Sequence, residues 1–151
     1  MESYEVYFQL VLAVILGGLI GLERTISHKT AGMRTFAFVT LGSTIFSIIS
    51  EMVATDPSRI AAQVVVGIGF LGAGLIILKH DDSGKEKVWG LTTAAGLWVA
   101  AAVGMAIGYH FYGIAIVATI LSLFIFLVLW WVESHFIKPF SHKKDKGELE
   151  E

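Results

Sequence analysis

Residues 6–22 read VYFQLVLAVILGGLIGL, an apolar run without a charged side chain. A helix needs about 20 predominantly apolar residues to cross the hydrocarbon core of a bilayer, so the run predicts a transmembrane helix. No Lys or Arg precedes it, whereas a secretory signal begins with basic residues, and we therefore expect a permanent helix. Gly17 and Gly21 lie one turn apart on one face, which favours close packing against another helix.

The composition of the whole chain indicates a membrane protein. Of its 151 residues, 55% are hydrophobic and 16% are charged, and the mean hydropathy is +0.72. Soluble domains carry about 25% charged residues. The formal net charge of −2 does not indicate nucleic-acid binding. The chain contains no cysteine, nucleophile elbow, phosphate loop or HExxH motif, so we expect that it is not an enzyme.

Five segments are long and apolar enough to span a bilayer, and short loops connect them. They are residues 6–22, 35–54, 57–79, 90–109 and 113–132. Short connections make helices that follow one another in sequence antiparallel neighbours in space. The sequence therefore predicts an all-α, polytopic transmembrane bundle at residues 1–132, followed by a charged cytoplasmic tail at residues 133–151.

Lys and Arg are concentrated on one side of the predicted bundle. With five spans, the first loop, the third loop and the tail lie on the same side, and together they hold ten of the eleven basic residues. Arg59, in the second loop, is the eleventh. Cytoplasmic loops carry an excess of Lys and Arg. We therefore expect the N-terminus outside the cell and the C-terminus in the cytoplasm.

Small residues provide the packing surfaces of the predicted spans. The fourth span carries Gly96, Gly104 and Gly108 on one face. The third span carries four glycines that do not share a face, namely Gly67, Gly69, Gly72 and Gly74. Either this helix is central and contacted on several sides, or it is irregular and lines a site. Trp98, near the middle of the fourth span, needs a partner for its indole N–H. The fifth span has no glycine from Ile114 to Val132 and is expected at the periphery.

A polar stripe follows one face of the second predicted span. Its members recur at helical spacing, and they are Thr40, Ser43, Thr44, Ser47, Ser50 and Glu51. Such a stripe is expected to face the interior of the bundle. Its hydroxyls could bond to their own helix and to neighbouring helices, or they could line a polar conduit. The sequence leaves both interpretations open.

A polar cluster is predicted near the outer membrane face. Its members lie around the second loop, and they are Glu51, Asp56, Arg59 and Gln63. Asp56 precedes Pro57, which is the arrangement of a helix N-cap. Hydrated Mg²⁺ needs only one or two carboxylates, which Glu51 and Asp56 could supply, although accidental pairs meet the same requirement. No other cofactor is indicated.

A second polar cluster is predicted on the cytoplasmic side. Three span ends could converge there, and they contribute Glu23, Arg24, Arg34, Thr92 and Thr93. The alternative is that these residues only anchor the helices at the interface and cap their ends.

Four motifs resemble the N-terminal membrane domain of the MgtC/SapB family of bacterial inner-membrane proteins. They are GLIGLER at 18–24, AGMRT at 31–35, DPSRIAAQVVVGIGFLGAG at 56–74 and WGLTTAAGLW at 89–98. The motifs cover the first four spans in order. Thr25 and Val66 depart from the family pattern, in which acidic and small polar residues are common there. Longer members add a soluble domain after the last span, so we expect a short member.

The resemblance implies a protein linked to magnesium limitation, acid stress and, in pathogens, survival inside host cells. Members have been labelled magnesium transporters, but the family picture is that of a regulator with effects on ATP synthase and membrane potential. We therefore expect a regulatory protein that docks against a membrane-protein partner or a second copy. The alternative is a transporter or channel for magnesium or another cation, with a polar path through the second and third spans.

Overall fold

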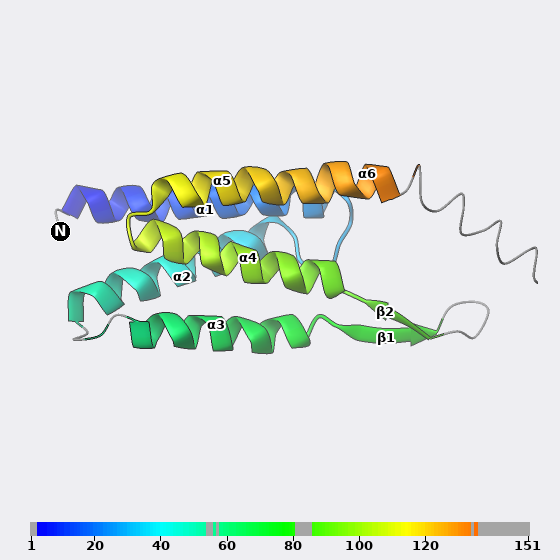
Figure 1. The fold of residues 1–151 in the computed structure, drawn as a ribbon, viewed down its shortest axis with the longest axis horizontal. Helices are drawn as coiled ribbons and strands as arrows, with labels where there is room; N and C mark the ends of the chain where they lie inside the picture. The colour runs from blue at the N-terminus through cyan, green and yellow to red at the C-terminus, as the bar shows by residue number, and fades with distance from the viewer. Residues whose placement is uncertain (1–2, 54–55, 57, 81–85, 134, 136–151) are drawn as a thin grey trace, which may run out of the picture.

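The computed structural model describes residues 3–53, 56, 58–80, 86–133 and 135. The predicted tail at 133–151 lies outside the described residues, apart from positions 133 and 135. The helices run along one common axis, and a two-stranded hairpin extends from one end of the bundle (Figure 1).

The predicted all-α transmembrane bundle is confirmed. The elements are α1 (Ser3–Ile26), α2 (Met33–Val53), α3 (Ser58–Ala73), β1 (Ile77–His80), β2 (Glu86–Trp89), α4 (Leu91–Gly108), α5 (Tyr112–Phe124), the π-helical segment η1 (Ile125–Leu129) and α6 (Trp130–Val132). Among the described residues, α1, α2, α4 and the continuous helix Tyr112–Val132 are long and apolar enough to cross a membrane, while α3 is a shorter apolar helix.

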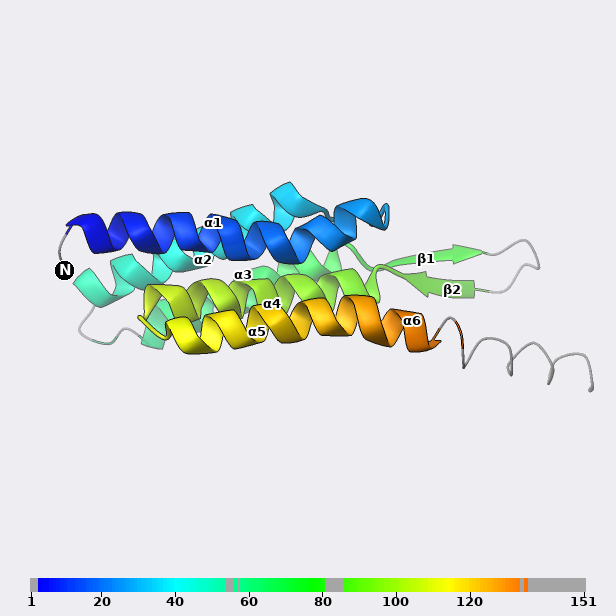
Figure 2. The ribbon, with the colours of Figure 1, turned by 90° about the horizontal axis from the view of Figure 1, so that it is seen from above.

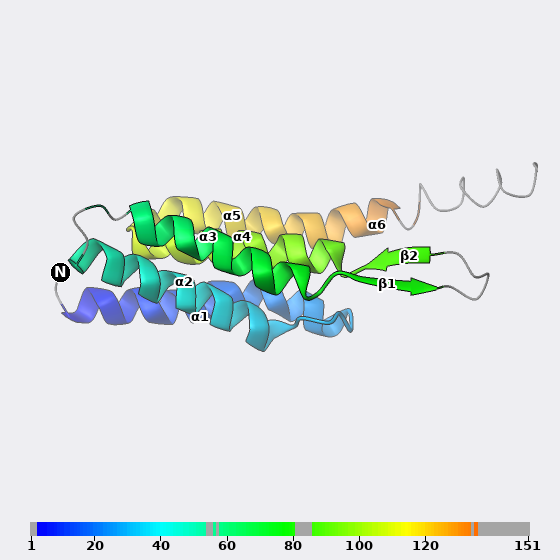
Figure 3. The same cartoon turned by 90° about the horizontal axis from the view of Figure 1, so that it is seen from below.

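Helix α4 occupies the centre of the bundle. It contacts α1, α2, α3 and α5. Figure 1 shows α1 and α5 on one side of α4 and α3 on the other, and Figures 2 and 3 show the same arrangement from above and below. Half of the residues of α4 are buried, which is a larger share than in the neighbouring α3 or α5.

Glycines allow α1 and α4 to approach α2 closely. A Cβ atom added at Gly17 of α1 would lie 2.5 Å from Thr40 Oγ1. One added at Gly108 of α4 would lie 2.5 Å from Ser47 Cβ, and one at Gly104 would overlap the Thr40 carbonyl oxygen. Gly21 is similarly close to the backbone at the start of α2. In lipid, such close backbone approach takes the place of a hydrophobic driving force.

The hydroxyl stripe of α2 joins α2 to α4. Thr44 Oγ1 is 2.8 Å from the Gly104 carbonyl oxygen and 2.9 Å from its own helix's Thr40 carbonyl. Thr40 Oγ1 is 3.3 Å from the Ala100 carbonyl. Ser47 Oγ donates to the Ser43 carbonyl at 2.9 Å. These groups are all buried, so the stripe acts here as a contact between helices.

Helix α3 differs from the sequence-based expectation of a central helix. Among the described residues of α3, only Ile68 and Gly72 are buried. A Cβ added at Gly67 or Gly69 would meet no atom of the described chain within 4 Å. Gly67 and Gly69 therefore leave an open surface, whereas Gly72 faces α4, because α3 packs on α4 and α2.

The third span also ends earlier than predicted. The helix stops at Ala73 rather than near position 79, and residues 77–80 form a strand instead. Successive turns at Gly74, Leu75 and Ile76, whose amides bond to carbonyls three or four residues back, close the helix end. Trp98 of α4, which was predicted to take part in helix packing, is 54% exposed.

We expect Gly104→Ala to lower the thermal unfolding midpoint of the purified protein in detergent. The added methyl group collides with the α2 backbone, and overpacking of this kind costs about 1–3 kcal/mol. Gly67→Ala is the matched control, because its methyl group enters open space. Equal midpoints for the two variants would show that the α2–α4 approach does not limit stability.

Candidate functional site

The end of the bundle that carries Arg24, Arg34 and the hairpin, here called the basic end, buries a charged side chain. Arg24 lies in the last turn of α1 and is only 5% exposed. Its Nη2 donates to Thr93 Oγ1 of α4 at 3.0 Å, and its Nη1 lies 3.4 Å from Glu23 Oε2. A cation at this place is favoured by the dipole of α1.

Phe126 covers the Arg24 guanidinium. The guanidinium carbon lies 4.4 Å from the centre of the Phe126 ring, which meets Phe36 edge to face at 6.4 Å. Phe126 belongs to the π-helical segment η1, and π-helical turns are frequent at functional sites. Gly96 makes room for the ring, since a Cβ there would lie 2.6 Å from Phe126 Cζ.

We call Glu23, Arg24, Phe36, Thr93 and Phe126 the arginine cluster. The Arg24 Nε atom in its centre is buried and has no hydrogen-bond partner among the described residues. Burial of a guanidinium is costly unless its hydrogen bonds are satisfied. A cation–π contact in a desolvated place offsets part of that cost, by about 2 kcal/mol.

The structure brings together three of the five residues predicted on this side, Glu23, Arg24 and Thr93. Arg34 and Thr92 are exposed elsewhere, and Arg34 lines a shallow groove between α1 and α2. The two phenylalanines were not identified from sequence. Phe126 sits in a uniformly apolar span, where nothing distinguishes a lipid-facing ring from one that covers an arginine.

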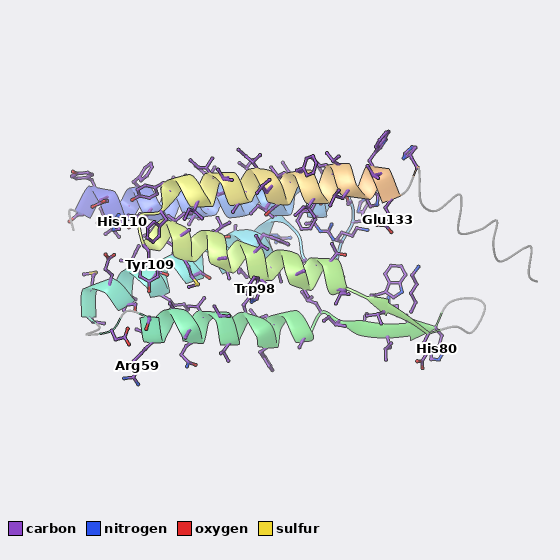
Figure 4. All side chains as sticks on the ribbon, in the orientation of Figure 1. Arg59, His80, Trp98, Tyr109, His110 and Glu133 are labelled. Carbon is purple, nitrogen blue, oxygen red and sulfur yellow. The ribbon has the colours of Figure 1, made fainter. Side chains whose placement is uncertain are left out.

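A second cluster lies at the opposite end, where the N-terminus is. His110, in the turn between α4 and α5, lies between two carboxylates: its Nδ1 is 3.1 Å from Glu5 Oε1, and its Nε2 is 3.5 Å from Glu51 Oε2. Figure 4 shows His110 at this end of the bundle. Tyr112 Oη is 3.2 Å from the same Nδ1 atom. The histidine cluster is formed by Glu5, Gln9, Glu51, His110 and Tyr112.

Gln9 attaches α1 to the end of α4. It is fully buried, and its Nε2 donates to the Ile107 and Gly108 carbonyls at 2.9 and 3.3 Å. Its Oε1 has no hydrogen-bond partner among the described residues. His110 itself has a φ of 62°, a left-handed conformation in which histidine is enriched relative to most residues.

The contacts of His110 join three parts of the chain. Its Nδ1 atom lies against Glu5 of α1, and its Nε2 atom lies against Glu51 of α2. The cluster therefore connects the ends of α1 and α2 to the α4–α5 turn.

The outer cluster predicted from sequence does not assemble. Glu51 pairs with His110, while Asp56 accepts hydrogen bonds from Ser58 N at 3.0 Å and Ser58 Oγ at 2.6 Å. These bonds hold the pKa of Asp56 below its usual value. Arg59 is exposed and points away from the other helices (Figure 4). Gln63 is exposed on α3 and faces a groove beside α2.

The carboxylates proposed for magnesium are thus both engaged with other groups. Within the described residues, no three or more His, Asp or Glu side chains are placed to hold one metal ion. His110 was not singled out from the sequence, because a lone histidine after a span shows no ligand spacing. Glu5 was likewise not singled out from the sequence.

Comparison with known proteins gives a consistent family match. The MgtC family profile matches residues 10–135. YhiD of Escherichia coli K12, whose name provisionally labels it a magnesium transporter, is 42% identical over 131 residues, covering 80% of this chain and 59% of that protein. Protein MgtC of Brucella abortus is 47% identical over 110 residues, covering 72% and 44%.

Protein SrpB of Synechococcus elongatus is 39% identical over 127 residues, covering 77% of this chain and 70% of that protein. The chain spans about half the length of the first curated relatives it matches, at 59%, 52% and 44%. No solved structure matches it. The matched region includes both clusters except Glu5 and Gln9.

We expect Arg24→Ala to destabilise the protein by about 2–5 kcal/mol, because it leaves a cavity in the buried arginine cluster and removes the hydrogen bond to Thr93. The measurement is the unfolding midpoint in detergent. Arg34→Ala is the control, since removal of an exposed arginine should change stability by less than about 0.5 kcal/mol. Similar effects of both substitutions would contradict a special role for the arginine cluster.

We expect His110→Asn to loosen the N-terminal end of the bundle. Asparagine tolerates the left-handed backbone but cannot reach both carboxylates. Amide hydrogen exchange near Glu5 and Glu51 should become about fivefold faster, equivalent to one net hydrogen bond. His28, which has a φ of 52°, provides the matched control as His28→Asn. Unchanged exchange in His110→Asn would show that His110 does not hold the ends of α1 and α2 together.

Proposed function

The chain belongs to the MgtC family, and on that premise we propose that it is a regulatory protein that docks against another membrane protein. It is a multi-pass protein of the bacterial inner membrane. The proposed setting is the one implied by the family resemblance, namely magnesium limitation, acid stress or intracellular survival. The observation that carries the proposal is the open groove between α2 and α3.

This groove lies between α2 and α3 on the surface of the described bundle. It has a volume of about 540 Å³, and its lining includes Phe38, Gly42, Phe46, Gln63, Gly67 and Leu71. Added Cβ atoms at Gly42 and Gly67 would meet no atom of the described chain within 4 Å. The α2–α3 groove therefore offers two small residues on its walls that no other part of the described chain approaches.

The chemistry of the groove favours a transmembrane helix as the occupant. Small residues let helix backbones approach closely, and polar side chains hydrogen-bond across such contacts. The Gln63 amide lies within the sequence of an apolar helix, where an unpaired polar group is costly and a partner's donor or acceptor would satisfy it. The glycines of α1 and α4 are already in contact with α2, so Gly42 of α2 and Gly67 and Gly69 of α3 are the ones left for a partner.

Magnesium transport is the alternative, and the name of the Escherichia coli relative favours it. It would require a polar path through α2 and α3. The α2 hydroxyls donate to carbonyl groups of their own helix and of α4, so a path through them would have to open these hydrogen bonds. The groove between α2 and α3 is lined mostly by apolar side chains.

The test uses the absence of cysteine from the chain. Phe46→Cys places a single thiol in the groove, and crosslinking in the native membrane should give one discrete adduct with a membrane protein. Gly67→Leu fills the groove and should reduce the adduct at least tenfold without lowering the unfolding midpoint. Gly113→Leu is the matched control, because Gly113 also faces open space but lies on α5.

Two results would overturn the proposal. One is an adduct that Gly67→Leu and Gly113→Leu leave equally intact. The other is Mg²⁺ flux into proteoliposomes of the purified protein that Asp56→Ala abolishes, which would establish transport. The absence of flux from folded, inserted protein, together with loss of the adduct in Gly67→Leu, is the expected outcome.

A further inference from the structure

The β1–β2 hairpin projects past the ends of α3 and α4 at the basic end (Figures 1 and 3). The strands are antiparallel, with Ile77 opposite Trp89, Leu78 opposite Val88, Lys79 opposite Lys87, and His80 opposite Glu86. All eight side chains are exposed. An isolated two-stranded hairpin is marginally stable at best in water, so a surface that covers these exposed side chains would stabilise this one.

The hairpin changes from apolar to charged along its length. Its two pairs next to the helices are apolar, and their side chains are about half exposed: Ile77 46%, Leu78 65%, Val88 51% and Trp89 51%. The two pairs farther out consist of Lys79, Lys87, His80 and Glu86. His80 marks the far end in Figure 4. This order matches a bilayer boundary, where the surroundings change from hydrocarbon to charged headgroups.

The length of α3 places the hairpin at that boundary. Its 16 residues extend about 24 Å, which is shorter than the roughly 30 Å hydrocarbon core. Exposed sheet edges do not occur within the hydrocarbon region, so the apolar pairs belong at its edge. The attachment is close: Gly90 has a φ of 88°, and a Cβ there would overlap the Leu75 carbonyl group.

One face of the hairpin concentrates positive charge beside an indole ring. Alternate residues share a face of a strand, which puts Lys79, Lys87 and Trp89 together. Both lysine Nζ atoms lie 5.7 Å from the Trp89 ring centre. Like charges directly opposite each other destabilise a strand pair. The opposite face carries no such excess, because His80 Nε2 lies 3.8 Å from Glu86 Oε1.

We propose that the hairpin docks onto anionic phospholipid headgroups. A phosphate between Lys79 and Lys87 removes their mutual repulsion, while the Trp89 indole lies at the interface, where tryptophan is enriched. Basic segments next to a membrane attract anionic lipids. The hairpin surface is separate from the α2–α3 groove, so this inference does not depend on the docking of a partner helix.

The test follows Trp89 fluorescence in the full chain with Trp98→Phe, Trp130→Phe and Trp131→Phe. Nanodiscs contain phosphatidylcholine and phosphatidylglycerol in equal amounts, and a nitroxide quencher is attached to one lipid or to the other. We expect labelled phosphatidylglycerol to quench Trp89 more strongly, with the preference lost at 1 M NaCl. Each lysine removed should weaken the preference about fivefold.

The charge-removing variants are Lys79→Gln and Lys87→Gln, singly and together. The matched control is the pair His80→Gln and Glu86→Gln, which removes the charged residues of the opposite face and should keep the lipid preference. An unfolding midpoint equal to that of the parent shows that each variant is folded. Equal quenching by both lipids in the parent chain would overturn the proposal and assign the exposed hairpin to a protein partner. A preference that persists in the double lysine variant would overturn it as well.

Discussion

The rest of the structure depends on the close approach of α2 to α4. In a bilayer, lipid chains are as apolar as leucine, so helices gain little by hiding apolar side chains from lipid. Gly104 and Gly108 bring the two backbones together, and Thr44 then reaches a carbonyl of α4. At Thr40, which Gly104 also approaches, Gly17 brings α1 equally close, and Gly21 does the same at the start of α2. A polar stripe that would be costly in lipid thus becomes the contact that orders three helices.

This spacing also determines what can assemble at each end of the bundle. At the basic end, Arg24 reaches Thr93 because α1 and α4 lie on the same side of α2, and Gly96 leaves the space that Phe126 fills. At the opposite end, buried Gln9 fixes α1 to the last carbonyls of α4, which places His110 between two carboxylates. Both clusters are therefore consequences of helix spacing, and a change in spacing would alter both.

The sequence was sufficient for the fold class and for much of the helix packing, because both depend on local patterns of hydropathy and small residues. The sequence also predicted that Glu23, Arg24 and Thr93 lie at the same end of the bundle, because short loops bring the ends of their spans to the same side. The contacts of Phe126 with Arg24, and of His110 with two carboxylates, could not be predicted, because they join residues far apart in the sequence. The open positions of Gly67 and Gly69 could not be predicted, because a small residue looks the same in sequence whether it meets a neighbour within the chain or remains open.

The rest of the described chain buries only two residues of helix α3. Its two open surfaces, the α2–α3 groove and the hairpin that follows it, are therefore mechanically connected. Helix α3 contacts α4 and α2, begins after the Asp56 cap, and continues into the hairpin through the turn that Gly90 closes against Leu75. A displacement of α3 would therefore carry β1 with it, while β2 stays attached to α4. Because the two strands are hydrogen-bonded to each other, a partner that holds α3 also fixes the hairpin at the headgroups. Under the proposed regulatory function, this connection would link the partner contact within the membrane to the lipid contact at the membrane surface.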